Sequence, residues 1–208
     1  MARPPAKTKA APFALIAVAI AGVLVLTAGL LIGLAFRDST KGVAGGPLGA
    51  AIGGPFSLID QYGKPFTEAN LKGKWQLVFF GYTHCPDVCP TALNDLSLAL
   101  DQLGAKKNEV GIVFISVDPE RDTPAVLKSY VDSFDGPIVA LTGLPDAVAQ
   151  AAKDYRVYYA KHPRADGGYD MDHSAVIYLM DPQGRFTATF TPDDNAETIV
   201  ARLQKLLA

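Results

Sequence analysis

The sequence of 208 residues has few of the residues that mark several common classes of protein. It contains two cysteines, which excludes a small domain held together by many disulfides. Only 19% of its residues are charged and the formal net charge is −2, so it lacks the basic excess of a nucleic-acid-binding protein. Motifs of serine hydrolases, P-loop proteins and dinucleotide-binding folds are absent. Its hydrophobic content of 49% excludes a disordered chain, and its length predicts one domain of ordinary size with some chain to spare.

One long hydrophobic run lies near the N-terminus, in residues 13–36. It has no charged side chain, and its only strongly polar side chain is Thr27. Because about 20 apolar residues in a helix cross the hydrocarbon core, the run predicts a transmembrane helix. A cleaved signal peptide is the alternative, but its apolar core has only about 7–15 residues and ends at a small-residue cleavage site. The run is longer and no convincing site follows it, so we expect an uncleaved anchor.

Residues 1–12 form a short basic tail in front of this run, with Arg3, Lys7 and Lys9. Position as the first helix and a small excess of basic residues both predict that the tail stays inside. No Arg- and Ser-rich transit segment is present. We therefore expect a single-pass protein of the bacterial inner membrane, with a cytoplasmic N-terminus and a periplasmic domain. A mitochondrial inner membrane, with the tail in the matrix, is the alternative.

The rest of the chain divides into a linker and a folded domain. Residues 37–53 are dominated by Gly, Ala and Pro without a hydrophobic period, which predicts a flexible linker. Residues 54–208 alternate between strand and helix patterns. We expect a hairpin at 56–67 and strands at 75–80, 110–117, 138–141, 156–160, 174–180 and 185–190. We expect helices at 91–103, 123–134, 145–155 and 195–207. This alternation predicts an α/β fold with a mixed sheet flanked by helices.

Both cysteines lie in GYTHCPDVCP, residues 81–90, between a predicted strand and a predicted helix. Pro90 suits the first position of a helix, so we expect Cys89 at the N-cap and Cys85 in the loop before it. The N-terminus of a helix stabilises a thiolate, which favours redox or metal chemistry at this turn. An inert disulfide or two buried thiols is the alternative, although a disulfide closing so short a loop adds little stability.

A second cluster, GGYDMDHS in residues 167–174, directly precedes an apolar strand. It contains His173, which by itself would be an ordinary surface histidine but beside a dithiol is a candidate third metal ligand. We expect Asp172 or Asp170 to orient its ring.

Two thiolates and one imidazole suit Cu(I), and also Cu(II) in a three-coordinate site. Zinc is the rival metal, but a structural zinc site needs four ligands and would have to recruit His84 or His162. We expect neither, because His84 adjoins Cys85 and is cramped for joint coordination, and His162 lies in a predicted surface loop.

A third polar segment, FISVDPERDTP in residues 114–124, follows a predicted buried strand. We expect it near the dithiol turn, because both segments follow neighbouring strands at their C-terminal ends. Asp118 in this segment and Asp87 between the cysteines are candidates to support the metal ligands. A loop tied by local ion pairs is the alternative interpretation of the segment.

The segments GYTHCPDVCP, ISVDPERDTP and DMDHSAVIYLMDPQGRF, in this order, resemble the Sco/SenC family of membrane-anchored copper proteins. The resemblance covers about residues 54–207 and extends to the single N-terminal span. It implies a thioredoxin-like fold that carries copper on Cys85, Cys89 and His173, with the two cysteines as a redox-active pair. It also implies delivery of copper to, or reduction of the cysteines of, the dinuclear copper centre of cytochrome c oxidase subunit II. A copper donor and a thiol reductant are then further partners.

Two other functions use the same residues. A thiol–disulfide oxidoreductase needs Cys85 and Cys89 but not His173, and a copper or redox sensor has no specific feature in the sequence. A peroxidase fits the implied fold but leaves His173 unexplained. We favour a metallochaperone over an enzyme.

Overall fold

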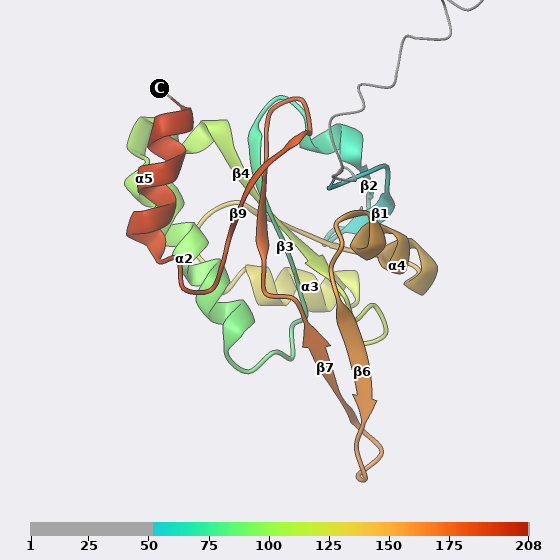
Figure 1. Cartoon of the computed structure of the whole chain (residues 1–208). Helices are drawn as coiled ribbons and strands as arrows, with labels where there is room; N and C mark the ends of the chain where they lie inside the picture. The colour runs from blue at the N-terminus through green and yellow to red at the C-terminus, as the bar shows by residue number, and fades with distance from the viewer. Residues whose placement is uncertain (1–51, 208) are drawn as a thin grey trace, which may run out of the picture. The chain divides into compact units, whose positions relative to one another are not determined.

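The computed structural model describes residues 52–207, and Figure 1 shows these residues as a sheet flanked by helices. The central sheet has seven strands in the order β2-β1-β5-β4-β3-β8-β9. Within it β3 pairs in parallel with β4, and β4 with β5, while the other pairs are antiparallel. The strands are β1 (Ser57–Asp60), β2 (Pro65–Thr67), β3 (Trp75–Gly81), β4 (Val110–Ser116), β5 (Ile138–Thr142), β8 (Ile177–Met180) and β9 (Phe186–Phe190). The predicted mixed sheet is confirmed.

Helices cover the sheet, and α2 packs against α5 (Figure 1). The helices are α2 (Val88–Gln102), α3 (Pro124–Val131), α4 (Pro145–Asp154) and α5 (Ala196–Leu206), with two short 3₁₀ helices, η1 (Glu68–Leu71) and η2 (Gly104–Glu109). Each of the four predicted helices is present. Two of them begin at side-chain caps, because Thr123 accepts a hydrogen bond from the N–H of Val126 and Asn195 accepts one from the N–H of Thr198.

The two central parallel strands, β3 and β4, form the middle of the core. Apart from Gln76 and Ser116, their residues are apolar on both faces, as expected of strands covered by helices on each side. Phe79, Phe80 and Phe114 are completely buried. Because parallel strands end at the same edge of the sheet, the segments after β3 and β4 emerge side by side, and the N–H of Val117 donates to the carbonyl of Gly81 at 2.8 Å.

A second, two-stranded sheet departs from the sequence prediction. It consists of β6 (Tyr159–Pro163) and β7 (Tyr169–His173), an antiparallel hairpin that projects from the body of the domain (Figure 1). The sequence predicts a short strand at 156–160, and places His173 after a Gly- and Asp-rich loop, directly before the strand at 174–180. Half of the strand residues are exposed; β6 shows no apolar alternation, and the alternation of Tyr169, Met171 and His173 with Asp170 and Asp172 in β7 covers only five residues. His173 is therefore the last residue of β7 and not the entrance to β8, which begins four residues later.

The predicted membrane anchor, residues 13–36, and nearly all of the predicted linker lie outside the described residues. Among residues 52–207, no helix combines the length and the apolar character needed to cross a membrane.

Candidate metal centre

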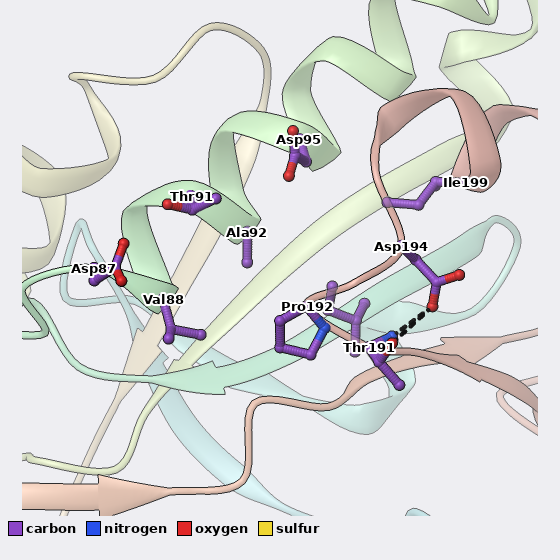
Figure 2. Close-up of a pocket in the computed structure, with 10 residues that line it drawn as sticks. Asp87, Val88, Thr91, Ala92, Asp95, Thr191, Pro192, Asp194 and Ile199 are labelled. Atoms are coloured by element: carbon purple, nitrogen blue, oxygen red, sulfur yellow. Dashed lines mark hydrogen bonds between the residues drawn. The ribbon is translucent and has the colours of Figure 1, made fainter.

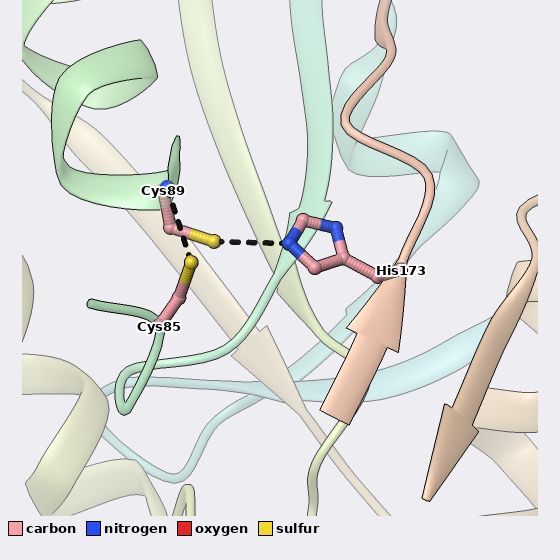
Figure 3. A group of neighbouring side chains, drawn as sticks. All are labelled: Cys85, Cys89 and His173. Atoms are coloured by element: carbon pink, nitrogen blue, oxygen red, sulfur yellow. Dashed lines mark hydrogen bonds between the residues drawn. The ribbon is translucent and has the colours of Figure 1, made fainter. Parts of the chain in front are cut away.

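Two thiols and one imidazole meet at the edge of the sheet where β3 and β4 end (Figure 3). Cys85 lies in the loop after β3, Cys89 in the first turn of α2, and His173 at the end of β7. The two Sγ atoms and a ring nitrogen of His173 all lie within 4.8 Å of one another. Sγ of Cys89 is 3.3 Å from Nε2 of His173, although 84 residues separate them, and the N–H of Cys89 lies 3.4 Å from Sγ of Cys85. Both cysteines are free thiols.

The helix that carries Cys89 starts earlier than the sequence predicted. Its N-cap is Asp87, so Cys89 is the second residue of α2 and not the N-cap. Pro90 is then the third helical residue, which is compatible with proline because the N–H groups of the first turn have no partner within the helix. The helix thus begins two residues earlier than predicted; Cys89 lies inside the domain, with no exposed surface, while Cys85 stays partly exposed in the loop.

Gly81, the last residue of β3, is what allows Cys89 to occupy this position. A Cβ atom on Gly81 would lie 2.7 Å from Sγ of Cys89 and 2.8 Å from Cε2 of Phe114. Contacts this short do not occur without a shift of the neighbours. The sequence motif contains Gly81, but only the packing shows that it faces the buried thiol.

Two aromatic rings and one carbonyl group hold the ring of His173. The ring of Tyr82 packs edge-on against it with centroids 5.6 Å apart, and that of Phe79 at 6.0 Å. Nδ1 of His173 lies 3.2 Å from the carbonyl oxygen of Ser174. Because a carbonyl only accepts hydrogen bonds, Nδ1 carries the proton, and in the neutral ring Nε2 presents its lone pair to the thiols. This is the tautomer that a metal ligand requires.

The two thiols differ strongly in acidity. A hydrogen bond with the side chain of Cys89, supported by the backbone N–H groups of Asp87 and Cys89, lowers the pKa of Cys85 to about 3 in spite of its partial burial. The same hydrogen bond and burial raise the pKa of Cys89 above its usual range. Burial, with the nearby Cys85, raises the pKa of Tyr82 to about 12, so its hydroxyl stays protonated beside the Cys85 thiolate. Cys85 is thus the anionic, accessible thiol of the pair.

A buried carboxylate fixes the loop that carries Cys85. Asp122 has no exposed surface and accepts three hydrogen bonds. They come from the N–H of Thr83 at 3.0 Å, the hydroxyl of Thr83 at 2.6 Å and the hydroxyl of Ser116 at 2.6 Å. The predicted proximity of residues 114–124 to the dithiol turn is therefore confirmed, but through Asp122, which the sequence interpretation did not single out.

Asp118 also lies in this loop, and it contacts the hairpin and not the thiols. It pairs with Arg121 and accepts a hydrogen bond from the hydroxyl of Tyr169 at 2.7 Å. The guanidinium of Arg121 lies over the ring of Tyr169, 3.9 Å from its centroid. These contacts attach β7, the strand that ends at His173, to the body of the domain.

The other predicted supporting residues lie apart from the ligands. Asp172 pairs with His162 at 2.9 Å and Asp170 with Arg164 at 3.2 Å, both on the exposed surface of the hairpin. The expectation that one of them orients the ring of His173 is not met, because successive side chains of β7 point to opposite faces and the carbonyl of Ser174 takes that role. Asp87 is exposed at the N-cap of α2.

Neither of the other histidines joins the metal-ligand group. His84 is exposed, with Nδ1 at 3.1 Å from the hydroxyl of Thr83, and His162 belongs to the hairpin pair with Asp172. In the described part of the chain the group has three members and no fourth Cys, His, Asp or Glu. A closed four-ligand zinc site made by this chain alone is therefore not present there.

Comparison with known proteins identifies relatives of this chain. Residues 45–208 match the family described as SCO1/SenC. The chain is 46% identical over 151 residues to protein SCO1 homolog 1, mitochondrial, of Arabidopsis thaliana, covering 72% of this chain and 45% of the relative. It thus spans about half the length of curated relatives that it matches.

Solved structures agree with that match. The copper-bound structure of Bradyrhizobium japonicum ScoI is 52% identical, covers 74% of this chain and 99% of its own, and has a TM-score of 0.70. BsSco, described as a member of the Sco family of cytochrome c oxidase assembly proteins with a disulfide switch, is 25% identical, covers 77% and 95% of the two chains, and has a TM-score of 0.59.

Proposed function

The chain belongs to the SCO1/SenC family, and from this premise we propose that it binds copper and delivers it to the dinuclear copper centre of cytochrome c oxidase subunit II. Copper is the cargo of this process. Subunit II is the proposed acceptor, and a copper-donating chaperone and a thiol reductant are the other proposed partners. The copper in ScoI and the link of BsSco to oxidase assembly support the proposal.

The observation that carries the proposal is the convergence of Cys85, Cys89 and His173 within 4.8 Å. Two sulfur atoms and one imidazole nitrogen are a soft donor set, which suits Cu(I) and a thiolate–imidazole Cu(II) site. No carboxylate of the described residues enters the group, so a hard cation such as Mg²⁺ finds no suitable ligands there.

The three side chains contribute in different ways. Cys85 is already a thiolate and partly exposed, so it makes the first bond to incoming metal. Cys89 is a buried thiol that must lose its proton to bind, so loading releases a proton. His173 offers Nε2 without rearrangement because Ser174 already fixes its tautomer. Release then proceeds by ligand exchange, in which cysteines of the acceptor replace those of this chain.

A thiol–disulfide oxidoreductase is the second candidate function. The observation that favours it is the pairing of an accessible, acidic Cys85 with a buried Cys89 whose N–H lies 3.4 Å from the first sulfur. In that reaction Cys85 attacks a disulfide of the partner, and Cys89 resolves the mixed disulfide. It requires both cysteines and makes no use of His173.

The proposal places the domain at a membrane surface. Residues 13–36 are the proposed anchor, residues 1–12 the inner tail and residues 37–53 the tether to a domain outside the inner membrane. The named relatives come from a plant mitochondrion and from a bacterium. Of the two compartments, we favour the bacterial periplasm over the mitochondrial intermembrane space.

Replacing His173 separates the two functions in cells. In a bacterial strain that lacks its own family member, the full chain should restore cytochrome c oxidase activity and the copper content of subunit II. His173→Ala should lose both, while His162→Ala, which removes an exposed histidine of the same hairpin, should retain them. Full oxidase activity with His173→Ala would contradict copper delivery and support the oxidoreductase.

A further inference from the structure

A cavity of about 200 Å³ lies alongside the candidate metal centre (Figure 2). It is enclosed by the first two turns of α2, the start of β8, and the loop that joins β9 to α5. Its floor is apolar and is formed by Val88, Ala92, Ile177, Pro192 and Ile199. The cavity has the size of one or two apolar side chains, which no residue of the described chain fills.

Carboxylates surround this apolar floor. Asp87, Asp95 and Asp194 line the cavity, and no Lys or Arg does so. Asp194 accepts hydrogen bonds from Thr191, as the dashed line in Figure 2 shows. Asp87 and Asp95 form no ion pair with any residue in 52–207, and burial together with the charge of Glu197 raises the pKa of Asp95. The cavity therefore combines an apolar floor with negative charge that lacks a cation.

The wall of the cavity is also part of the metal-binding segment. Asp87 and Val88 lie between Cys85 and Cys89 in the sequence, and Ile177 lies four residues after His173. The cavity is therefore within reach of a partner segment whose cysteine has approached Cys85. The residues next to that cysteine in the partner segment are the ones that can fill the cavity.

We propose that this cavity seats an apolar side chain of the partner segment that exchanges ligands or disulfides with Cys85, and that a Lys or Arg beside that side chain pairs with the surrounding carboxylates. The inference rests on the proposed function and adds the kind of partner sequence that the site selects. An acidic segment would meet like charge at Asp87, Asp95 and Asp194. A long cationic side chain fits the arrangement because its stem is apolar while its head is charged.

Thiol–disulfide exchange provides a direct probe. The thiolate of Cys85 attacks the peptide sulfur of a peptide–thionitrobenzoate disulfide, forming a Cys85–peptide disulfide and releasing the coloured thionitrobenzoate anion. Cys89 then loses its proton to solvent and attacks Cys85, which closes the Cys85–Cys89 disulfide and releases the peptide thiolate. Two electrons pass from the protein dithiol to the peptide disulfide, so no other reductant is needed.

The experiment compares three such peptides with the reduced full chain in detergent under anaerobic conditions. The peptides are identical except that the cysteine is followed by Leu-Lys, Leu-Glu or Ala-Lys. At low salt we expect the Leu-Lys peptide to react about tenfold faster than the Leu-Glu peptide, and this ratio to shrink as salt rises. We also expect it to react several-fold faster than the Ala-Lys peptide.

Variants of the protein test whether the cavity residues cause the peptide preferences. Asp95→Lys should reduce the Lys-over-Glu ratio to about 2 or less, whereas Asp146→Lys, an equal charge change in the first turn of α4, should leave it unchanged. Thr91→Trp, an exposed position at the cavity wall, should remove the Leu-over-Ala preference. Equal rates for all three peptides, or equal effects of Asp95→Lys and Asp146→Lys, would overturn the inference.

Copper content measured on the same preparations separates the two claims. Asp95→Lys and Thr91→Trp should bind as much copper as the original chain, since neither residue belongs to the ligand group. Copper binding without peptide selectivity would overturn the cavity inference and leave the proposed function standing. Peptide selectivity without copper binding would overturn the proposed copper function and leave the cavity inference standing.

Discussion

At the scale of single residues, Gly81 shows how closely the backbone of β3 approaches the buried ligand. Replacement by alanine places a Cβ 2.7 Å from Sγ of Cys89, so either the thiol or Phe114 must move. We expect Gly81→Ala to lower the free energy of unfolding by about 1–3 kcal/mol, as overpacking of a core does, and to weaken copper binding.

The matched control for this change is Gly143→Ala, where a Cβ would lie 3.1 Å from a methyl group of Leu58 and would contact none of the three ligands. Denaturant unfolding and a copper competition titration measure the two effects. The account expects copper affinity to fall for Gly81→Ala only. Unchanged affinity in Gly81→Ala would show that Cys89 does not depend on this contact.

Cys85 provides a pH-dependent prediction. Because hydrogen bonding lowers the pKa of Cys85 from 9.0 to about 3, the thiolate persists across the neutral and mildly acidic range. The rate of alkylation by iodoacetamide in the reduced, copper-free chain should stay nearly constant from pH 8 down to pH 5. An ordinary thiol would lose about tenfold in rate for each pH unit below its own pKa of about 8.5.

The lowered pKa of Cys85 also determines how the stability of the fold changes with pH. A lowered pKa in the folded state means that ionised Cys85 stabilises the fold fully above the ordinary thiol pKa. This contribution declines as the pH falls from about 9 towards 3. Cys85→Ser is the control, and it should show neither the fast alkylation nor this part of the pH dependence. An alkylation rate that falls steeply below pH 8 would contradict the assignment of Cys85 as the thiolate.

At the scale of elements, the β4–α3 loop acts as the support of the cysteine loop. Asp122→Asn replaces one acceptor oxygen by an NH₂ group that faces the donors on Thr83 and Ser116. We expect a loss of about 1–3 kcal/mol in the free energy of unfolding because buried donors lose their partner. Copper affinity should also fall by about tenfold, as is common when groups that hold metal ligands are removed.

Thermal unfolding and copper competition check this prediction, with Asp132→Asn at the exposed end of α3 as the control. A stability loss without any change in copper affinity would restrict Asp122 to a structural role. Full retention of both properties would contradict the hydrogen-bond network seen around it.

Sequence patterns predicted the elements with apolar periodicity and missed those without it. The apolar runs of β3, β4 and β8 and the four helices were all expected. The hairpin of β6 and β7 was not, because half of its strand residues are exposed and cross-strand backbone pairing holds the two strands together. Pro90 suggested a helix start at Cys89, whereas a proline in the first turn also fits a helix that begins two residues earlier.

The ligand set was predicted from residue types and from resemblance, but its geometry was not. Nothing in the spacing of Cys89 and His173 indicates that two atoms 84 residues apart lie at 3.3 Å. The roles of Asp170 and Asp172 were expected from their place next to His173 in the sequence. Alternation along a strand instead turns Asp172 away from the ring, to His162.

At the scale of the whole molecule, the proposed tether links a charged domain to a membrane. Residues 37–208 contain 16 basic and 21 acidic side chains, so anionic lipid offers this part little attraction. Anchoring then acts through effective concentration, because a tethered domain meets a membrane-bound acceptor far more often than a free one does.

Releasing the domain tests that idea. A chain cut at an engineered protease site within residues 37–51 should keep its copper but deliver it to a membrane-embedded acceptor at least about tenfold more slowly at equal total concentration. Replacing the linker by a Gly/Ser segment of equal length should have no effect. Equal delivery rates for the cut and uncut chains would show that the anchor serves another purpose.

The central claim is that Cys85, Cys89 and His173 together hold copper, and anaerobic Cu(I) and Cu(II) titration of the reduced full chain tests it most directly. Metal content and the thiolate-to-copper absorption of the Cu(II) form should show one copper per chain. His162→Ala should match the original chain, whereas His173→Ala and Cys85→Ser should lose the absorption and most of the bound copper. Copper content and absorption unchanged in His173→Ala would contradict the three-ligand site, and a reduced original chain that binds no copper would leave the dithiol as a redox pair alone.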